Sequence, residues 1–175
     1  MTMTPRVRKF ALTAHVISSV GWLGAVAGFL ALAIASLASQ DAQTVRATYL
    51  AMELTGWFVL VPLSLASLLT GLVQSFGTKW GLFRHYWVVM KLSITVLASI
   101  VLLVYTRTLG YFADVAGDTT SSGVNLGELQ TPSPVLHAGV GLLLLLVATV
   151  LAVFKPSGLT RYGRKPREQR TVSQP

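Results

Sequence analysis

Residues 9–38 read KFALTAHVISSVGWLGAVAGFLALAIASLA, an almost unbroken apolar stretch whose only histidine is His15. Three more stretches of this kind follow, at about 47–76, 84–107 and 133–154. Each is at or above the roughly 20 residues that a helix needs to cross a hydrocarbon layer about 30 Å thick. The sequence therefore predicts an all-α, polytopic membrane protein, an antiparallel bundle of four transmembrane helices.

The composition leaves little for any other domain. Of the 175 residues, 53% are hydrophobic and only 11% are charged. We therefore interpret residues 1–155 as one four-helix transmembrane domain and residues 156–175 as a basic cytoplasmic tail. The chain has no cysteine, which excludes disulfides and thiolate metal sites, so any redox work requires a cofactor. The N-terminus imitates a signal peptide, but its apolar stretch is about twice the usual length, and we interpret it as a retained helix.

The positive charges mark one side of the membrane. Eleven of the 14 Lys and Arg residues precede or open the first stretch, lie between the second and third, or follow the fourth. The positive-inside rule then predicts that both termini lie in the cytoplasm. The positive residues behind the net charge of +8 thus gather on one side of the predicted membrane spans. We therefore expect the protein's partner to be the lipid bilayer and not a nucleic acid. The eleven residues are Arg6, Arg8, Lys9, Lys79, Arg84, Lys155, Arg161, Arg164, Lys165, Arg167 and Arg170.

Each apolar stretch carries an ionisable residue well inside it, and these are His15, Glu53, Lys91 and His137. Such a group in hydrocarbon costs roughly 2.5 to 3.5 kcal/mol for Lys or Asp on insertion scales, so it usually faces a bundle interior. His15 and Lys91 lie about 9 and 10 Å from the inner ends of their helices. Glu53 and His137 lie about 9 and 6 Å from the outer ends. The sequence therefore predicts an inner pair and an outer pair, whose histidines are roughly 15 Å apart, too far for one metal ion.

Helical projection predicts which faces point inward. In the first helix a polar face lies opposite a glycine face. Small residues let helix backbones approach closely, so the glycine face predicts a helix contact and leaves a homodimer open. In the second helix one stripe of small and polar residues is expected to face protein. The polar face is His15, Ser18, Ser19 and Trp22, the glycine face is Gly21, Gly24 and Gly28, and the stripe is Glu53, Gly56, Trp57, Ser64, Ser67, Gly71 and Gln74.

Three features mark the ends and interruptions of the helices. Pro62 lies within the second apolar stretch and should kink its helix. The link at 108–132 is rich in Gly, Asp, Ser and Thr, which predicts a flexible outer loop or, alternatively, a lid over an outer site. Ser133 is placed to cap the last helix, and Pro134 suits its first position.

The spacing His15-x6-Trp22-x-Gly24, followed by Trp87-x3-Lys91, resembles HemJ-type protoporphyrinogen oxidase and the copper-resistance D-type membrane haem proteins. It is still more similar to a family of short bacterial integral membrane proteins of uncharacterised function with the same four-helix layout. The resemblance implies a bacterial cytoplasmic (inner) membrane protein with a b-type haem held by His15. It also implies that Lys91 lies near the iron or a haem propionate.

The chain departs from both of the named patterns. The HemJ-type pattern has an arginine after the histidine in its first helix, whereas no charged residue stands between His15 and Asp41 here. The copper-resistance proteins have additional helices. We therefore do not predict that this chain oxidises protoporphyrinogen. Whether it is an enzyme stays open.

Three functional hypotheses follow. The first is a membrane haem b protein with a redox or haem-handling role. In it His15 binds the iron, Lys91 is a second candidate ligand, and the pocket is lined by Trp22, Trp87 and Ser19. The second is a cofactor-free structural or partner-binding membrane subunit in which His15 bonds near Lys91. The third is a small proton-coupled transporter.

The outer pair has its own alternatives. Glu53 and His137 are either a structural pair that joins the second and fourth helices or a second haem or metal site. A proton path from outside is the remaining interpretation. The predicted partners of the haem protein are a redox partner or another membrane subunit.

Overall fold

The computed structural model describes residues 3–77, 85–118, 126–155, 158 and 160. Within these ranges four segments are helices long and apolar enough to cross a membrane, which confirms the predicted all-α class and the four spans for the described residues. The second span consists of three consecutive elements. The elements are α1 (Pro5–Ala38), α2 (Ala42–Thr55), η1 (Gly56–Leu60), α3 (Val61–Gly77), α4 (Tyr86–Gly117), α5 (Leu126–Leu129) and α6 (Ser133–Phe154).

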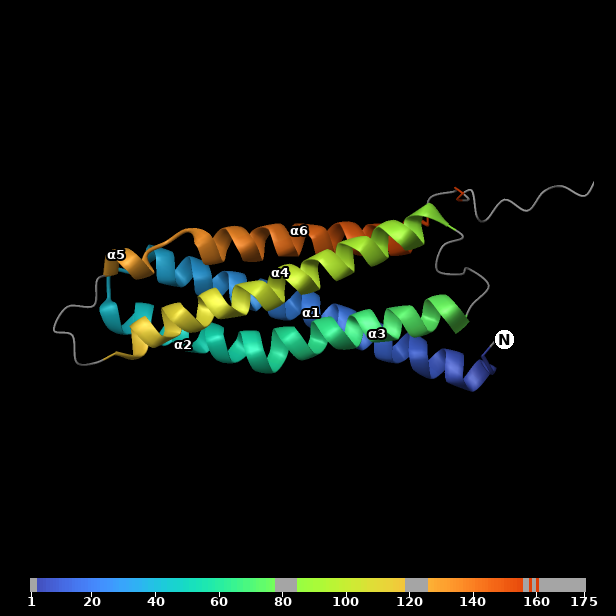
Figure 1. Cartoon of the computed structure of the whole chain (residues 1–175), viewed down its shortest axis with the longest axis horizontal. Helices are drawn as coiled ribbons and strands as arrows, with labels where there is room; N and C mark the ends of the chain where they lie inside the picture. Colours follow the sequence, from blue (N-terminus) through green and yellow to red (C-terminus); the bar gives the residue numbers. More distant parts are fainter. Residues whose placement is uncertain (1–2, 78–84, 119–125, 156–157, 159, 161–175) are drawn as a thin grey trace, which may run out of the picture.

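The four spans lie side by side along one axis, and successive spans run in opposite directions (Figure 1). α1 packs against α2, α3 and α6, and α4 packs against the same three helices. α1 and α4 therefore occupy diagonal corners of the bundle. We call the end near the chain's N-terminus the inner half and the end that carries α5 the outer half (Figure 1).

The outward faces of the spans are apolar. Large apolar side chains such as Phe10, Phe58, Phe76 and Phe154 are exposed along the length of the bundle. A soluble protein rarely exposes so much contiguous apolar surface. These faces and the lengths of the helices indicate a multi-pass membrane protein surrounded by lipid.

The second span contains a π-helical turn, Gly56–Leu60, which ends two residues before Pro62. In this turn the backbone N–H of Val61 donates to the carbonyl of Gly56, five residues earlier. The extra residue rotates the helix before the turn relative to the helix after it. Most of the stripe predicted to face inward nevertheless does so on both sides of the turn: Glu53 is half-buried, and Gly56 and Ser67 are buried. Ser64 is fully buried, as predicted, but Trp57 is 49% exposed, so the prediction that Trp57 faces protein is wrong.

α4 continues to Gly117, ten residues beyond the end that the sequence predicts. Within this extension Leu109, Ala113 and Ala116 are buried, and their spacing of four and three residues is that of one helix face. The prediction of a loop is therefore wrong for residues 108–117. That prediction came from the polar composition of this segment, although its buried residues form one helix face. Residues 119–125 of the predicted loop, and residues 161–175 of the predicted tail, lie outside the described residues.

The start of α6 also differs from the prediction. Ser133 is the first helical residue, and Pro132 occupies the N-cap position, which has no side-chain cap hydrogen bond. The hydroxyl of Ser133 instead lies 3.3 Å from that of Tyr105 and 3.4 Å from Nδ1 of His137. The prediction that Ser133 caps the helix is wrong, and its side chain connects α6 to α4.

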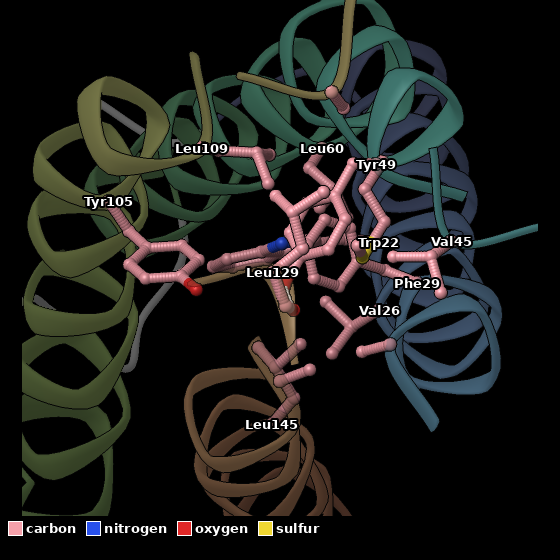
Figure 2. Packing of buried hydrophobic residues seen from close by; sticks show 14 residues of the cluster. Trp22, Val26, Phe29, Val45, Tyr49, Leu60, Tyr105, Leu109, Leu129 and Leu145 are labelled. Atoms are coloured by element: carbon pink, nitrogen blue, oxygen red, sulfur yellow. Dashed lines mark hydrogen bonds between the residues drawn. The ribbon is translucent and has the colours of Figure 1, made fainter. Parts of the chain in front are cut away.

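The apolar core lies mainly in the outer half. Figure 2 shows its side chains converging from α1, α2, α4, α5 and α6, with Trp22, Tyr49 and Leu109 among them. The Tyr49 hydroxyl donates to the carbonyl of Leu129, so the short helix α5 is tied to α2. Apolar packing and this bond thus hold α2 and α5 together in the outer half.

Candidate functional site

Polar side chains from three helices meet in the inner half and form what we call the inner polar layer. The imidazole of His15 lies at the centre of this layer. Its Nδ1 bonds to a side chain of α3, and its Nε2 bonds to a side chain of α4. Most polar side chains of this layer thus bond to one another inside the bundle and do not face the hydrocarbon of the bilayer. The layer consists of His15, Ser18 and Ser19 on α1, Ser67 and Thr70 on α3, and Lys91 on α4.

The hydrogen bonds of His15 define its tautomer. Its Nδ1 lies 3.0 Å from Oγ1 of Thr70. That hydroxyl lies 2.6 Å from the carbonyl oxygen of Ala66 and 3.2 Å from that of Ser67. Because a carbonyl can only accept, the Thr70 proton goes to the backbone, and Oγ1 accepts from His15. Nδ1 therefore carries the proton of the neutral ring, and Nε2 presents a lone pair.

Lys91 reaches this lone pair from the opposite corner of the bundle. Its Nζ lies 3.2 Å from Nε2 of His15, and their helices α1 and α4 are diagonal to one another. The two residues therefore meet near the bundle axis, in keeping with the equal depths that the sequence predicts. The distance is that of a hydrogen bond and is shorter than the roughly 4 Å between two nitrogens opposed on one metal ion. Of the two residues, Lys91 has the longer and more flexible side chain and would move to admit such an ion.

α3 provides a seat for the imidazole. A Cβ added at Gly71 would lie 3.2 Å from Cε1 of His15, so this glycine makes room for the ring. One turn earlier, Oγ of Ser67 lies 2.9 Å from Oγ of Ser19, and Ser19 also lies 3.5 Å from Nε2 of His15. The sequence predicted that Ser67 and Gly71 face inward but missed Thr70. Its position directly before Gly71 and three residues after Ser67 was the available signal.

The structure brings together three of the five residues predicted to surround haem. His15, Ser19 and Lys91 belong to the inner polar layer. Trp22 is buried in the apolar core of the outer half, about 10 Å along the helix from His15. Trp87 lies at the start of α4, with its ring centroid 6.4 Å from that of His85.

The outer pair is not brought together. Nδ1 of His137 bonds to the carbonyl of Ser133 at 2.9 Å, and its ring stacks on Tyr105 with the centroids 4.0 Å apart. The carboxylate of Glu53 lies instead near Gly110. Within the described ranges no hydrogen bond or ion pair joins Glu53 to His137. Nor do these ranges contain a group of three or more His, Asp or Glu residues that could hold a metal ion.

The glycine face of α1 is mostly open. A Cβ at Gly21 would contact Leu63 of α3 at 3.5 Å, whereas one at Gly24 or Gly28 would meet nothing within 4 Å. Among the described residues, the predicted close helix contact is therefore seen only at Gly21. Gly24 and Gly28 are exposed on the side of the bundle that faces away from the other helices.

The outer half also contains a cavity of about 390 Å³ between α1, η1, α4 and α6. Its walls are mainly apolar and include Leu97, Leu102 and Leu145. His137 and Tyr105 add polar atoms to its lining, but His15 is not part of it. The cavity and the inner polar layer are therefore two separate candidate sites.

No protein family, no curated protein and no solved structure matches this chain. In the inner polar layer a neutral imidazole has one nitrogen held by a protein hydroxyl and its other nitrogen directed at the bundle axis. This is a common arrangement for a metal-ligating histidine, whose second nitrogen donates to a protein acceptor.

Proposed function

We propose that the chain is an integral membrane b-type haem-binding protein with a redox or haem-handling role. The haem is held in the inner polar layer by His15, with Lys91 close to it. The observation that supports this most directly is the orientation of His15, whose Nδ1 is bonded to Thr70. This bond leaves Nε2 as the nitrogen that would bind iron once Lys91, which now bonds to it, moves aside.

A b-type haem at this position would supply one-electron chemistry at its iron. The protein's own residues hold and orient the ligand. Thr70 keeps the imidazole in the Nδ1–H tautomer, and Gly71 gives its ring room. Lys91 bonds to Nε2 as the structure stands. It could serve as a second ligand once deprotonated, or pair with a propionate while charged.

An absorption spectrum of protein purified after expression with ample haem tests the proposal. We expect a Soret band that is lost in His15→Ala and kept in His137→Ala, because only His15 belongs to the inner polar layer. A colourless, folded wild-type protein would overturn the proposal. So would a band that survives in His15→Ala but disappears in His137→Ala, since the iron would then belong to the outer half.

The proposal includes an orientation in a bacterial cytoplasmic (inner) membrane, as an antiparallel bundle with both termini in the cytoplasm. The distribution of Lys and Arg supports it. Because the chain has no cysteine, single cysteines can report each side. We expect Asp41→Cys, but not Thr4→Cys, to react with a membrane-impermeant maleimide in intact cells. The reverse pattern would reject this orientation.

One observation favours a second candidate, a cofactor-free structural or partner-binding subunit. Bonds from Lys91 to His15, and from His15 to Thr70, connect α4, α1 and α3 without any additional group. Such a protein would be colourless, and His15→Ala would lower its stability without changing a spectrum. The open glycines Gly24 and Gly28 leave a homodimer or a subunit contact as its natural partner surface.

A further inference from the structure

We propose that the outer cavity binds a single narrow amphiphile that enters from the bilayer. Its hydroxyl or carboxylic acid head group donates a hydrogen bond to Nε2 of His137. This site is separate from the inner polar layer and does not depend on haem.

The shape of the cavity favours a narrow ligand. Its wall on α4 extends from Leu97 to Leu109, which corresponds to about 18 Å along a helix. Its volume of about 390 Å³ is enough for one hydrocarbon chain. The cavity is therefore an elongated slot whose length matches one extended chain.

The entrance of the slot lies on the lipid-facing surface. Leu97 on α4, and Leu136 and Val140 on α6, line the cavity and are each more than half exposed. The slot therefore opens between these two helices where hydrocarbon surrounds the bundle. A ligand dissolved in the bilayer could enter without passing through water.

His137 lines the slot at its outer end and is itself exposed. Nδ1 of His137 lies 2.9 Å from the carbonyl of Ser133. Because a carbonyl only accepts, Nδ1 carries the proton, and Nε2 of the neutral ring is an acceptor. Nε2 has no hydrogen-bond partner in the part of the chain that the structure describes. Stacking on Tyr105 holds the ring, so the acceptor has a defined position.

The neighbouring hydroxyls are already engaged. The Thr106 hydroxyl donates to the carbonyl of Leu103 at 2.7 Å, and the Tyr105 hydroxyl lies 3.3 Å from that of Ser133. A ligand with one O–H group and an otherwise apolar body is therefore complementary to this end of the slot. Fatty alcohols and fatty acids share that chemistry.

The test uses photoreactive tetradecanol, whose extended chain is about as long as the slot, with the full-length protein in lipid nanodiscs. Two glycines of α6 provide a matched pair of variants. A Cβ meets nothing within 4 Å at either Gly139 or Gly141, but only Gly141 lines the cavity. We expect saturable labelling of α4 and α6 that is abolished in Gly141→Leu and unchanged in Gly139→Leu.

His137→Phe tests the head-group contact, because it keeps a ring on Tyr105 and removes the acceptor. We expect unlabelled tetradecanol to compete about five- to tenfold less well in this variant. The methyl ether of tetradecanol should compete weakly and equally against wild type and variant. Tetradecanoic acid competing better than tetradecanol would identify the acid as the preferred source of the O–H group.

Three results would overturn the proposal. The first is an ether that competes as well as the alcohol, because the cavity would then take up only hydrocarbon. The second is an equal loss of labelling in Gly139→Leu and Gly141→Leu. The third is labelling that does not saturate.

Discussion

The inner half of the bundle connects its helices through side-chain hydrogen bonds, whereas the outer half relies on apolar packing and contains a cavity. In the inner half the bonds of His15 join three helices. In the outer half Met52 and Leu109 are almost completely buried among apolar neighbours. Within a bilayer apolar packing adds little directionality, because lipid tails are as apolar as the side chains. The polar layer therefore specifies how the helices align, and the apolar half can leave space for a ligand.

The largest expected effect comes from the apolar half. Leu109 is 2% exposed, and its Cδ2 would lie 3.1 Å from a Cβ at Gly56. We expect Leu109→Ala to destabilise the protein by about 2 to 3 kcal/mol, because it removes packing atoms and leaves a void. Unfolding by sodium dodecyl sulfate in mixed micelles would measure this.

Val104→Ala is the control for Leu109→Ala, because Val104 lies on the same helix and is 65% exposed. We expect it to change stability by less than about 0.5 kcal/mol. Equal losses in the two variants would mean that the extension of α4 does not pack as the structure shows.

A smaller effect is expected from the seat of the imidazole in the inner half. Gly71→Ala places a methyl group 3.2 Å from Cε1 of His15 and should cost about 1 to 2 kcal/mol through overpacking. Gly24→Ala, where the new methyl group meets nothing within 4 Å, should be neutral or slightly stabilising. If Gly71→Ala proved as harmless as Gly24→Ala in the same unfolding assay, the close packing of His15 on α3 would be wrong.

The bond between Thr70 and His15 should contribute less. Thr70→Val keeps the shape of the side chain and removes the acceptor for Nδ1, which should cost about 0.6 to 1 kcal/mol inside a membrane. The more specific readout is the ¹⁵N spectrum of the His15 ring. Wild type should show the Nδ1–H tautomer, Thr70→Val should weaken this preference, and Thr70→Ser should restore it. An unchanged tautomer in Thr70→Val would remove the main support for iron binding through Nε2.

The sequence predicts the inner pair better than the outer pair, and the reason is geometric. Depth along a helix follows from counting residues, so the equal depth of His15 and Lys91 could be predicted. Rotation about the helix axis decides whether two residues at one depth meet. The ring of His137 stacks on Tyr105, whereas Glu53 lies near Gly110, and counting alone could not show this.

Other differences between the predictions and the structure arise where one feature of the local sequence obscured another. The π-helical turn Gly56–Leu60 shifts the helical phase, so a projection at a constant angle misplaces Trp57. Polar residues after 107 suggested a loop, although buried Leu109 and Ala113 continue one helix face. Contacts that depend on side chains from several helices, such as the walls of the cavity, have no local signal in the sequence.

The smallest effect is expected at the outer end of the bundle, where Asp41 caps the start of α2. Its carboxylate accepts from the hydroxyl of Thr44 at 2.6 Å and from the backbone N–H groups of Thr44 and Gln43. These bonds, that of the Thr44 hydroxyl first, hold the pKa of Asp41 below its ordinary value of 3.8. Because the folded pKa is below the unfolded one, the cap's contribution to stability is complete above pH 4 and is lost as the pH falls through the folded pKa.

Stability measured between pH 7 and pH 2.5 would test this cap. We expect wild type to lose a small part of its stability below pH 4 and Asp41→Asn to lose less, since it has no carboxylate to protonate there. Asp114→Asn, on an exposed part of α4, should keep the wild-type profile and serves as the control. A polar contact at the exposed end of a span is solvated in both states, so its loss should change stability much less than the same loss at Thr70. If Asp41→Asn proved more damaging than Thr70→Val, the inner polar layer would not be the main polar connection between the helices.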